Sequence, residues 1–344
     1  MVFGKDLAVV LAWPQCWAKA PEPIFEKLKK IGLFNSTYFR LGHAGILLID
    51  GTNGQLEYFD FGRYSTDVNQ GRVRSRRSDP KLIIDVRAEF DSNGDLENLS
   101  ELLGSIKSKQ EEMHGEGTMH VAVCKDFNFR QAKLFAESLQ DAGSLDYGSV
   151  SLKKINCANF VQKVLLKGIE CNKTKLRLRF PLTLFLPTPL GNVEAIRSPQ
   201  NYLVTEQEVI TKKRISQWAV VKVIYRSTIV NVTHKFFEVK TLNHLEPPVR
   251  NSRIPPEACW LGGQGEGTWM MLTVLKDKDN FYRIRGLAAN GDTEYDFIAT
   301  TKTQGFDAKN PYLFMPNCSR LGVTIIQEDR KIKLRHYQDF QEPF

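Results

Sequence analysis

The sequence lacks any uninterrupted apolar run of the roughly 20 residues that a membrane-spanning helix needs. It also lacks the paired spacings Cys-x-x-Cys and His-x-x-x-His, so we predict no metal centre. The most Gly-rich stretch, residues 262–269, has no Lys-Ser/Thr ending and no helical pattern after it. That argues against a phosphate cradle and favours a bulged strand start. We therefore expect no bound cofactor.

Cysteine is scarce as well, with six in a chain of 344 residues, scattered without paired spacing. A chain of this length can bury a sizeable core and does not need disulfides. Hydrophobic residues make up 42% of the chain and charged residues 25%. This composition is typical of a globular protein, and the length leaves room for two domains of ordinary size.

Residues 1–197 mix strand and helix patterns, which predicts an α+β domain. Within these residues, runs that are apolar or that alternate between apolar and polar residues predict strands, and apolar residues at helical spacing predict helices. The strands are expected at 7–12, 42–49, 56–61, 81–90 and 119–124, and the helices at 23–31, 96–108, 129–142 and 157–167. The Pro-containing stretch 181–199 is expected to be an irregular connector.

Residues 198–344 are dominated by strand-like runs separated by turn signals such as Ala289-Asn290-Gly291-Asp292. The strands are expected at 218–225, 269–275, 282–286, 293–299, 312–314, 321–327 and 331–336. This pattern predicts an antiparallel β-barrel or sandwich as a second domain. Its opening Gly267-x-Trp269 is similar to the start of lipocalin-like barrels.

Cys157 is the leading candidate for a functional residue. Asn156 before it is a good N-cap, apolar residues recur at helical spacing from Phe160 on, and Gly168 is a plausible helix end. In the first turn of a helix, free backbone N–H groups and the helix dipole favour the thiolate and lower the pKa of a cysteine. The alternative is a small buried cysteine without chemistry.

His43 is the candidate base, in an apolar run that ends at a turn-rich stretch and is followed by a returning strand. If Asn53-Gly54 form a two-residue hairpin turn, His43 shares a sheet face with Asp60, because side chains alternate along a strand. Asp60 could then orient the imidazole. A loop that differs by one residue would instead place Glu57 on that face. The alternative is a structural histidine on a strand.

These motifs together resemble a known family. His43-Ala-Gly-Ile-Leu-Leu-Ile, a turn, a second strand and later Tyr147 followed by Asn156-Cys157-x-x-Phe-Val are similar to the circularly permuted branch of the NlpC-type, papain-like cysteine hydrolases. The lecithin retinol acyltransferase-like proteins belong to this branch, in which the histidine precedes the cysteine. The resemblance covers residues 1–197. Its nearest form is an uncharacterised bacterial family that also carries Leu-Ala-Trp-Pro, here residues 11–14.

The resemblance implies a small antiparallel sheet that carries His43 and a helix that begins at Cys157. The chain departs from the acyltransferase-like members at two places. It has Ala158-Asn159 where they have Glu-His, and Glu57 or Asp60 where they usually offer a histidine as the third polar residue. These departures leave a hydrolase and an acyltransferase both open.

The function implied is a thiol hydrolase that cleaves an amide or ester of a small peptide or acyl substrate through an acyl-enzyme. An acyltransferase would run the same chemistry with an acceptor other than water. A non-catalytic binding protein that keeps the papain-like shell is the alternative from another class. The sequence does not specify the substrate, the ligand of the second domain or the oligomeric state.

The formal net charge is +8, and two basic clusters carry much of it. One lies in the polar loop 69–80, with arginines at 72, 74, 76 and 77, and the other in 173–180, where lysine and arginine alternate with apolar residues as in a strand. Each can be a solvated surface. If both rim the cleft, they favour an anionic substrate. No aromatic and basic platform is present, so we expect no nucleic-acid partner.

The N-terminal stretch, with its apolar run at 7–12 before Ala18-Lys19-Ala20, partly matches a signal peptide. The run is short, however, and Trp13 to Trp17 interrupt it. We expect it to form the first strand of the domain, and we expect a cytoplasmic protein.

Overall fold

The computed structural model describes residues 4–19, 27, 38–64, 66, 69–148, 153–181, 187–206, 208–213, 215–233, 247–262, 267–275, 280–303, 306–315 and 318–341. Contacts divide the chain into two compact units. The first unit comprises Met1–Gly62, Leu82–Ala142 and Asp146–Glu238, and the second comprises Arg63–Lys81, Gly143–Leu145 and Val239–Phe344. Two short elements, the 3₁₀ turn Pro80–Leu82 and β8 (Leu145–Asp146), fall where the chain passes between units. The fold is mixed α+β, as the sequence predicts.

The first unit is built on an antiparallel sheet with the strand order β10-β9-β7-β1-β4-β5. Its strands are β1 (Leu7–Trp13), β4 (His43–Ile49), β5 (Leu56–Gly62), β7 (Met119–Cys124), β9 (Gln200–Val204) and β10 (Val209–Lys213), and a separate ribbon pairs β2 (Trp17–Lys19) with β3 (Tyr38–Arg40). The central strand β1 is buried along its whole length and pairs with β4 and β7. An all-apolar strand forms here because helices cover both faces of the sheet.

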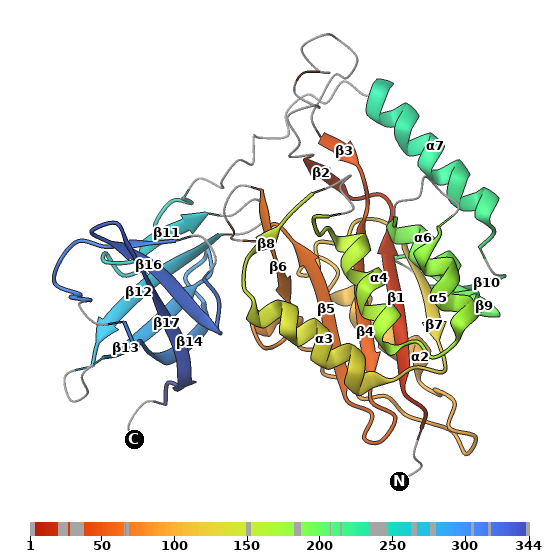
Figure 1. The fold of residues 1–344 in the computed structure, drawn as a ribbon, viewed down its shortest axis with the longest axis horizontal. Coiled ribbons are helices and arrows are strands. Elements are labelled where there is room, and N and C mark those ends of the chain that lie inside the picture. Colours follow the sequence, from red (N-terminus) through yellow and green to blue (C-terminus); the bar gives the residue numbers. More distant parts are fainter. Residues whose placement is uncertain are drawn as a thin grey trace. The chain divides into compact units, whose positions relative to one another are not determined.

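The helices of the first unit are α2 (Leu99–Ser108), α3 (Phe129–Asp141), α4 (Cys157–Gly168), α5 (Asn172–Arg179), α6 (Pro189–Ile196) and α7 (Gln217–Thr233). α3, α4 and α6 lie over one face of the sheet (Figure 1). α2 lies against the other face, where its Leu102, Leu103 and Ile106 pack with Leu47 and Tyr58. The predicted helix at 23–31 lies outside the described residues, apart from Lys27.

The β4–β5 hairpin has a different register from the predicted one. Gly45 pairs with Asp60, and the loop closes through hydrogen bonds from Asp50 N–H to the Gln55 carbonyl and from Gly54 N–H to the Asp50 carbonyl. The loop therefore contains four residues instead of two. The pairing moves by two positions, so every side chain stays on its predicted face.

Four sequence predictions in the first unit are wrong. The basic segment 173–180 is the helix α5, because its two buried residues, Thr174 and Leu178, lie one helical turn apart. The Val-rich segment 218–225 belongs to the helix α7. The connector 181–199 contains α6, which Thr188 caps and whose first residue is proline, a position that tolerates proline. Residues 83–89 form no strand.

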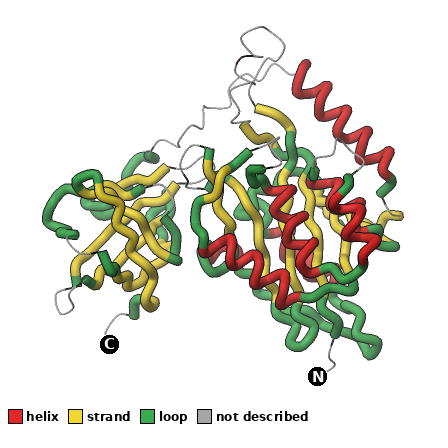
Figure 2. The backbone as a smooth tube through the Cα atoms, viewed as in Figure 1, coloured by secondary structure: helices red, strands yellow, loops and turns green. Residues whose placement is uncertain are grey.

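The second unit contains a seven-stranded, barrel-like antiparallel sheet with the order β11-β12-β13-β14-β17-β16-β15. The strands are β11 (Cys259–Gly262), β12 (Gly267–Val274), β13 (Phe281–Leu287), β14 (Thr293–Thr300), β15 (Leu313–Phe314), β16 (Gly322–Gln327) and β17 (Arg330–Asp339). Alternate residues point inward and form one core that includes Ile284, Phe297, Ile325 and Leu334. Figure 2 shows strands and loops, without an α-helix, in the described residues of the C-terminal part, 247–341. The predicted β domain is confirmed at the level of fold class.

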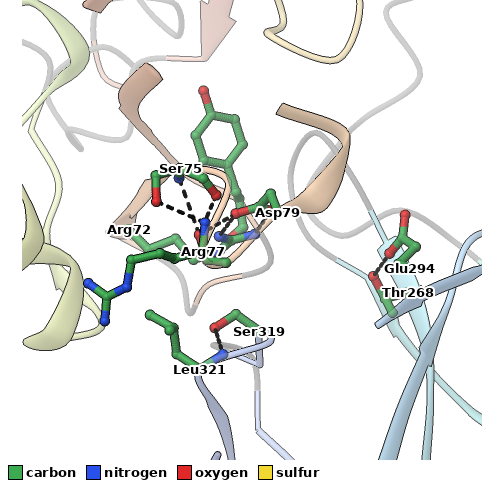
Figure 3. Close-up of polar contacts among 10 residues, drawn as sticks. Arg72, Ser75, Arg77, Asp79, Thr268, Glu294, Ser319 and Leu321 are labelled. Atoms are coloured by element: carbon green, nitrogen blue, oxygen red, sulfur yellow. Dashed lines mark hydrogen bonds and ion pairs between the residues drawn. The ribbon is translucent and has the colours of Figure 1, made fainter. Parts of the chain in front are cut away.

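The arginine-rich segment Arg63–Lys81, which contains β6 (Gln70–Arg74), belongs to this second unit. Arg72 donates two hydrogen bonds to the Asp79 carboxylate, at 2.7 and 2.8 Å, and Arg74 lies over the Tyr64 ring at 3.6 Å. Both arginines are buried. Glu294 accepts a hydrogen bond from the Thr268 hydroxyl (Figure 3). Its carboxylate also forms an ion pair with the Lys81 ammonium, at 3.0 Å. This basic cluster is therefore internal structure of the unit, and the expectation of a solvated loop is wrong for its two buried members.

Candidate active site

Cys157 is the first residue of α4, and it is partly exposed. The helix begins there because two asparagines cap it reciprocally. Asn156 accepts a hydrogen bond from the Asn159 N–H, and the Asn159 side chain accepts one from the Asn156 N–H, both at 2.9 Å. Asn159 also donates to the Lys154 carbonyl, at 2.8 Å. The N-cap predicted at Asn156 is confirmed, and Asn159 has a structural role in fixing the backbone before the thiol.

His43 is the first residue of β4 and is buried. Its direct partner on the neighbouring strand is Trp13, the last residue of β1. The two rings stack with their centroids 5.9 Å apart and an interplanar angle of 19°. Trp13 is in turn held by a hydrogen bond from its Nε1 to Gln110 Oε1, at 2.9 Å. The plane of the imidazole is therefore set by a ring that is itself anchored.

Asp60 lies beside the imidazole and is completely buried. His43 Nε2 is 3.5 Å from Asp60 Oδ2, and the Tyr58 hydroxyl donates a hydrogen bond of 2.9 Å to the same carboxylate oxygen. Tyr58 reaches that oxygen by passing over Gly45. A Cβ atom at position 45 would lie 2.7 Å from the Tyr58 hydroxyl oxygen, so this path requires glycine. The Asp60 carboxylate is thus held by the Tyr58 hydroxyl and lies next to the His43 imidazole.

Asp60 and Cys157 together determine the charge of His43. Burial alone would lower the pKa of the imidazole. Hydrogen bonds to Asp60 and to Cys157, and the charges of these two groups, outweigh burial and raise the pKa of His43 to about 9. The protonated imidazole is therefore favoured at neutral pH. A carboxylate on one side and a thiol on the other is the arrangement that stabilises a thiolate–imidazolium pair.

The chain bends sharply just before His43. Gly42 has φ = 77°, a conformation that side chains rarely adopt. Cys157 Sγ lies 3.9 Å from the Gly42 carbonyl oxygen. A side chain at position 42 would also press on Pro189 at the start of α6 and on the backbone of Trp13. The turn therefore lets the β4 terminus, α4 and α6 approach one another around the thiol.

Glu57, the other candidate carboxylate, does not meet His43. It lies three residues from Asp60 on β5 and so points to the opposite face of the sheet. Its carboxylate is 2.7 Å from the Lys133 ammonium of α3 and accepts a hydrogen bond from Gln55. The structure brings together Cys157, His43 and Asp60, and it leaves Glu57 in a separate buried ion pair.

Other thiols and histidines near the site have no comparable surroundings. Burial raises the pKa of Cys16 to about 12, and its thiol contacts the His114 carbonyl. Burial also lowers the pKa of His120, on β7, to about 4. Among the described residues, no group of three or more His, Cys, Asp and Glu side chains could hold a metal ion.

Sequence reasoning missed most of the positioning residues. Trp13 entered only as part of a family-like motif, and Gln110 did not enter at all. Strand alternation places Tyr58 on the same face as His43 and Asp60, but its hydrogen bond to the Asp60 carboxylate was not predicted. Gly45, in the middle of an apolar strand, is the signal that a neighbouring side chain crosses the backbone there.

Among the residues that the structure describes, no helix is long and apolar enough to cross a membrane.

Residues 8–174, just under half of the chain, match the family described as type VI secretion system effector TseH-like. Residues 258–337 match the DUF6695 C-terminal domain. No curated protein matches the chain.

One crystal structure, that of the type VI secretion system effector TseH, aligns with 61% of this chain and 99% of its own. The TM-score is 0.40 and the sequence identity 18%. The segment that matches the TseH-like family contains His43, Asp60 and Cys157.

Proposed function

We propose that this protein is a cysteine hydrolase that cleaves an amide or ester bond of a peptide or acyl substrate. One observation carries the proposal: a partly exposed cysteine at a helix N-terminus interacts with the buried His43, whose Nε2 lies 3.5 Å from the buried Asp60 carboxylate. Asp60 and that cysteine raise the pKa of His43 to about 9. A nucleophile, a base within reach and a group that orients the base are the three parts of this mechanism.

In the proposed reaction the Cys157 sulfur attacks the substrate carbonyl carbon, and the carbonyl π electrons move to oxygen. The first-turn N–H groups of α4, at Cys157 and Ala158, are donors that a helix leaves without intrahelical acceptors, and they stabilise this oxyanion. The tetrahedral species then collapses. The bond to the amine or alcohol breaks, and His43 gives that leaving group its proton.

The product of this first half is a thioester on Cys157 and a neutral imidazole. A water molecule then attacks the thioester carbonyl while His43 takes one of its protons. The carbon–sulfur bond breaks, the carboxylic acid leaves, and the thiolate–imidazolium pair is restored. Asp60 stabilises the imidazolium form in both halves of the reaction. With an alcohol or amine in place of water, the same steps describe an acyltransferase.

The match of residues 8–174 to the TseH-like effectors supports a hydrolase-type effector as the biological role. Because that family is named for a secretion system, the expected cytoplasmic localisation stays a prediction. The circular permutation relative to papain-like enzymes, the similarity of the second domain to lipocalin-like barrels, and a division into domains at 1–197 and 198–344 stay predictions.

The test is to trap the acyl-enzyme. The full chain is mixed with an activated aryl ester, quenched in acid, digested, and the Cys157 peptide is weighed by mass spectrometry. We expect an acyl adduct on Cys157 in the wild type and none in Cys157→Ala or His43→Ala. Cys259, which is exposed, is an internal control for unassisted acylation. Turnover without added acceptor favours a hydrolase. Turnover only with an added amine or alcohol favours an acyltransferase.

Acylation of Cys157 at the same rate in the wild type and in His43→Ala would overturn the proposal. So would acylation of Cys157 no faster than that of Cys259. Circular dichroism of the variants confirms that each one is folded.

A further inference from the structure

The outward face of α7 carries large apolar side chains where a surface helix normally carries polar ones. Trp218 is 81% exposed, Tyr225 66% and Val221 42%. On the opposite side of the helix, Val220 is buried in the first unit. α7 is therefore attached by one face and presents a second apolar face to solvent.

The exposed residues form a continuous stripe with a charged border. At 3.6 residues per turn, Trp218, Val221 and Tyr225 fall within an arc of about 60°. Lys222 and Arg226, both exposed, follow one side of this arc. The helix has no aspartate or glutamate from Gln217 to Thr233. The exposed face thus has an aromatic and apolar stripe, and all the charged residues beside this stripe are cationic.

α5 presents a surface of the same character. Leu176 is 59% exposed and Phe180, at its C-terminal end, is 64% exposed. Lys173 and Arg179 are exposed between and beside them, and this helix also has no acidic residue. α5 and α7 border one small cavity of about 100 Å³, to which they contribute Arg177, Phe180, Gln217 and Val220.

We propose that α7 and the exposed side of α5 form a surface that docks the protein on an anionic phospholipid bilayer. A helix with tryptophan and tyrosine on its apolar face and lysine and arginine beside it binds in the plane of the membrane interface. The aromatic rings enter the headgroup region, and the cations meet anionic headgroups. The inference concerns a surface separate from Cys157 and does not depend on the proposed chemistry.

Two alternatives fit this surface less well. In a dimer formed through α7, Lys222 and Arg226 of one copy would lie close to the same residues of the other copy, and α7 has no acidic residue to compensate their charge. A membrane-spanning arrangement is also disfavoured, since α7 has 17 residues with two charges on its exposed side and is held to the first unit through Val220.

The test is co-sedimentation of the full chain with large unilamellar vesicles. One set contains phosphatidylcholine alone, and the other contains phosphatidylcholine and phosphatidylglycerol at a ratio of about 3:1. We expect binding to the anionic vesicles that weakens with salt, because the attraction is screened. Lys222→Glu with Arg226→Glu is expected to weaken binding by more than about tenfold. Trp218→Ala with Tyr225→Ala is expected to do the same.

Matched controls come from the second unit. Lys331→Glu with Lys333→Glu changes the net charge by the same amount at two exposed positions of β17, and Leu313→Ala removes an apolar side chain that is 72% exposed. Neither control should change vesicle binding. Equal loss in controls and α7 variants would show non-specific attraction and overturn the proposal, as would no binding to either vesicle set.

A second measurement avoids any dependence on destabilised variants. Brominated phosphatidylcholine in the anionic vesicles quenches tryptophans that enter the bilayer, and Trp218→Phe keeps an apolar side chain while removing the fluorophore. We expect quenching in the wild type and its loss in Trp218→Phe. Quenching that persists in this variant would overturn the proposal. Sedimentation velocity without vesicles would also do so if it found a dimer that Trp218→Ala dissociates.

Discussion

Two buried carboxylates on β5 have opposite surroundings, although only two residues separate them. Asp60, on one face of the sheet, accepts a hydrogen bond from Tyr58 and lies 3.5 Å from His43. Glu57, on the other face, pairs with Lys133 at 2.7 Å. Asp60 faces an imidazole, whose pKa is raised to about 9, and Glu57 faces the ammonium of a lysine. Strand parity alone places Asp60 beside the imidazole and Glu57 beside Lys133.

The largest expected difference between these carboxylates is in activity. Asp60→Asn removes the charge that stabilises the imidazolium, and we expect kcat/KM to fall by about 10²- to 10⁴-fold. Glu57→Gln is the matched control, since it neutralises a carboxylate of the same strand, and it should change kcat/KM by less than about threefold. Steady-state kinetics on the ester that acylates Cys157 measures both. Equal losses would remove the distinction between the two faces.

The next difference is in the titration of His43. In the wild type its pKa is raised to about 9, and Asp60→Asn should lower it clearly, whereas Glu57→Gln should not. The folded-state pKa lies above the ordinary value near 6.5. Protonated His43 therefore stabilises the fold fully below pH about 6.5, and this contribution is lost as the pH rises through about 9.

NMR titration of the His43 Cε1–H signal, assigned by its absence in His43→Gln, measures this pKa directly. Denaturant unfolding at a series of pH values follows the linked change in stability. An unshifted His43 pKa in Asp60→Asn would show that the carboxylate does not act on the imidazole.

A smaller effect is expected on stability from the Glu57 side. Glu57→Gln leaves the Lys133 ammonium, which is 26% exposed, without its anionic partner, and we expect a loss of about 1–2 kcal/mol in the free energy of unfolding. The double variant Glu57→Gln with Lys133→Met should recover part of this loss. Urea unfolding measures both. A loss of activity without a loss of stability would contradict the structural role of this pair.

The smallest effect is expected from Tyr58→Phe. This variant keeps the buried ring and removes only the hydrogen bond of 2.9 Å to Asp60, which corresponds to about 1 kcal/mol or a fewfold loss in kcat/KM. Gly45→Ala should lower kcat/KM more, because its Cβ would displace the Tyr58 hydroxyl. A loss in Tyr58→Phe as large as in Asp60→Asn would mean that Tyr58 itself takes part in the reaction.

The sequence predicts the parts of this site that depend on local rules. The start of α4 follows from Asn156 and the apolar spacing after it, and the shared face of His43 and Asp60 follows from strand alternation. The shared face survives a wrong loop length because the real register differs by two residues, an even number. A shift of one residue would have exchanged Asp60 for Glu57.

Other features could not be predicted, because they depend on tertiary contacts. Alternating basic and apolar residues in α5 have the period of a strand, but only Thr174 and Leu178 are buried, one turn apart. The β-branched residues of α7 favour a strand by local propensity. The segment is a helix in the folded protein, in which Val220 is buried in the first unit. The anchoring of Trp13 by Gln110 joins residues 97 positions apart, and no local pattern reports it.

The most direct test of the Cys157–His43–Asp60 arrangement is the rate of alkylation by iodoacetamide against pH, resolved by peptide mass spectrometry. We predict that Cys157 of the wild type reacts well below pH 8, and faster than the exposed Cys259 in the same sample. We also predict that His43→Ala abolishes this advantage, that Asp60→Asn reduces it, and that Glu57→Gln leaves it unchanged. A Cys157 profile that follows an ordinary thiol titration in the wild type, or that is the same in His43→Ala, would contradict the account.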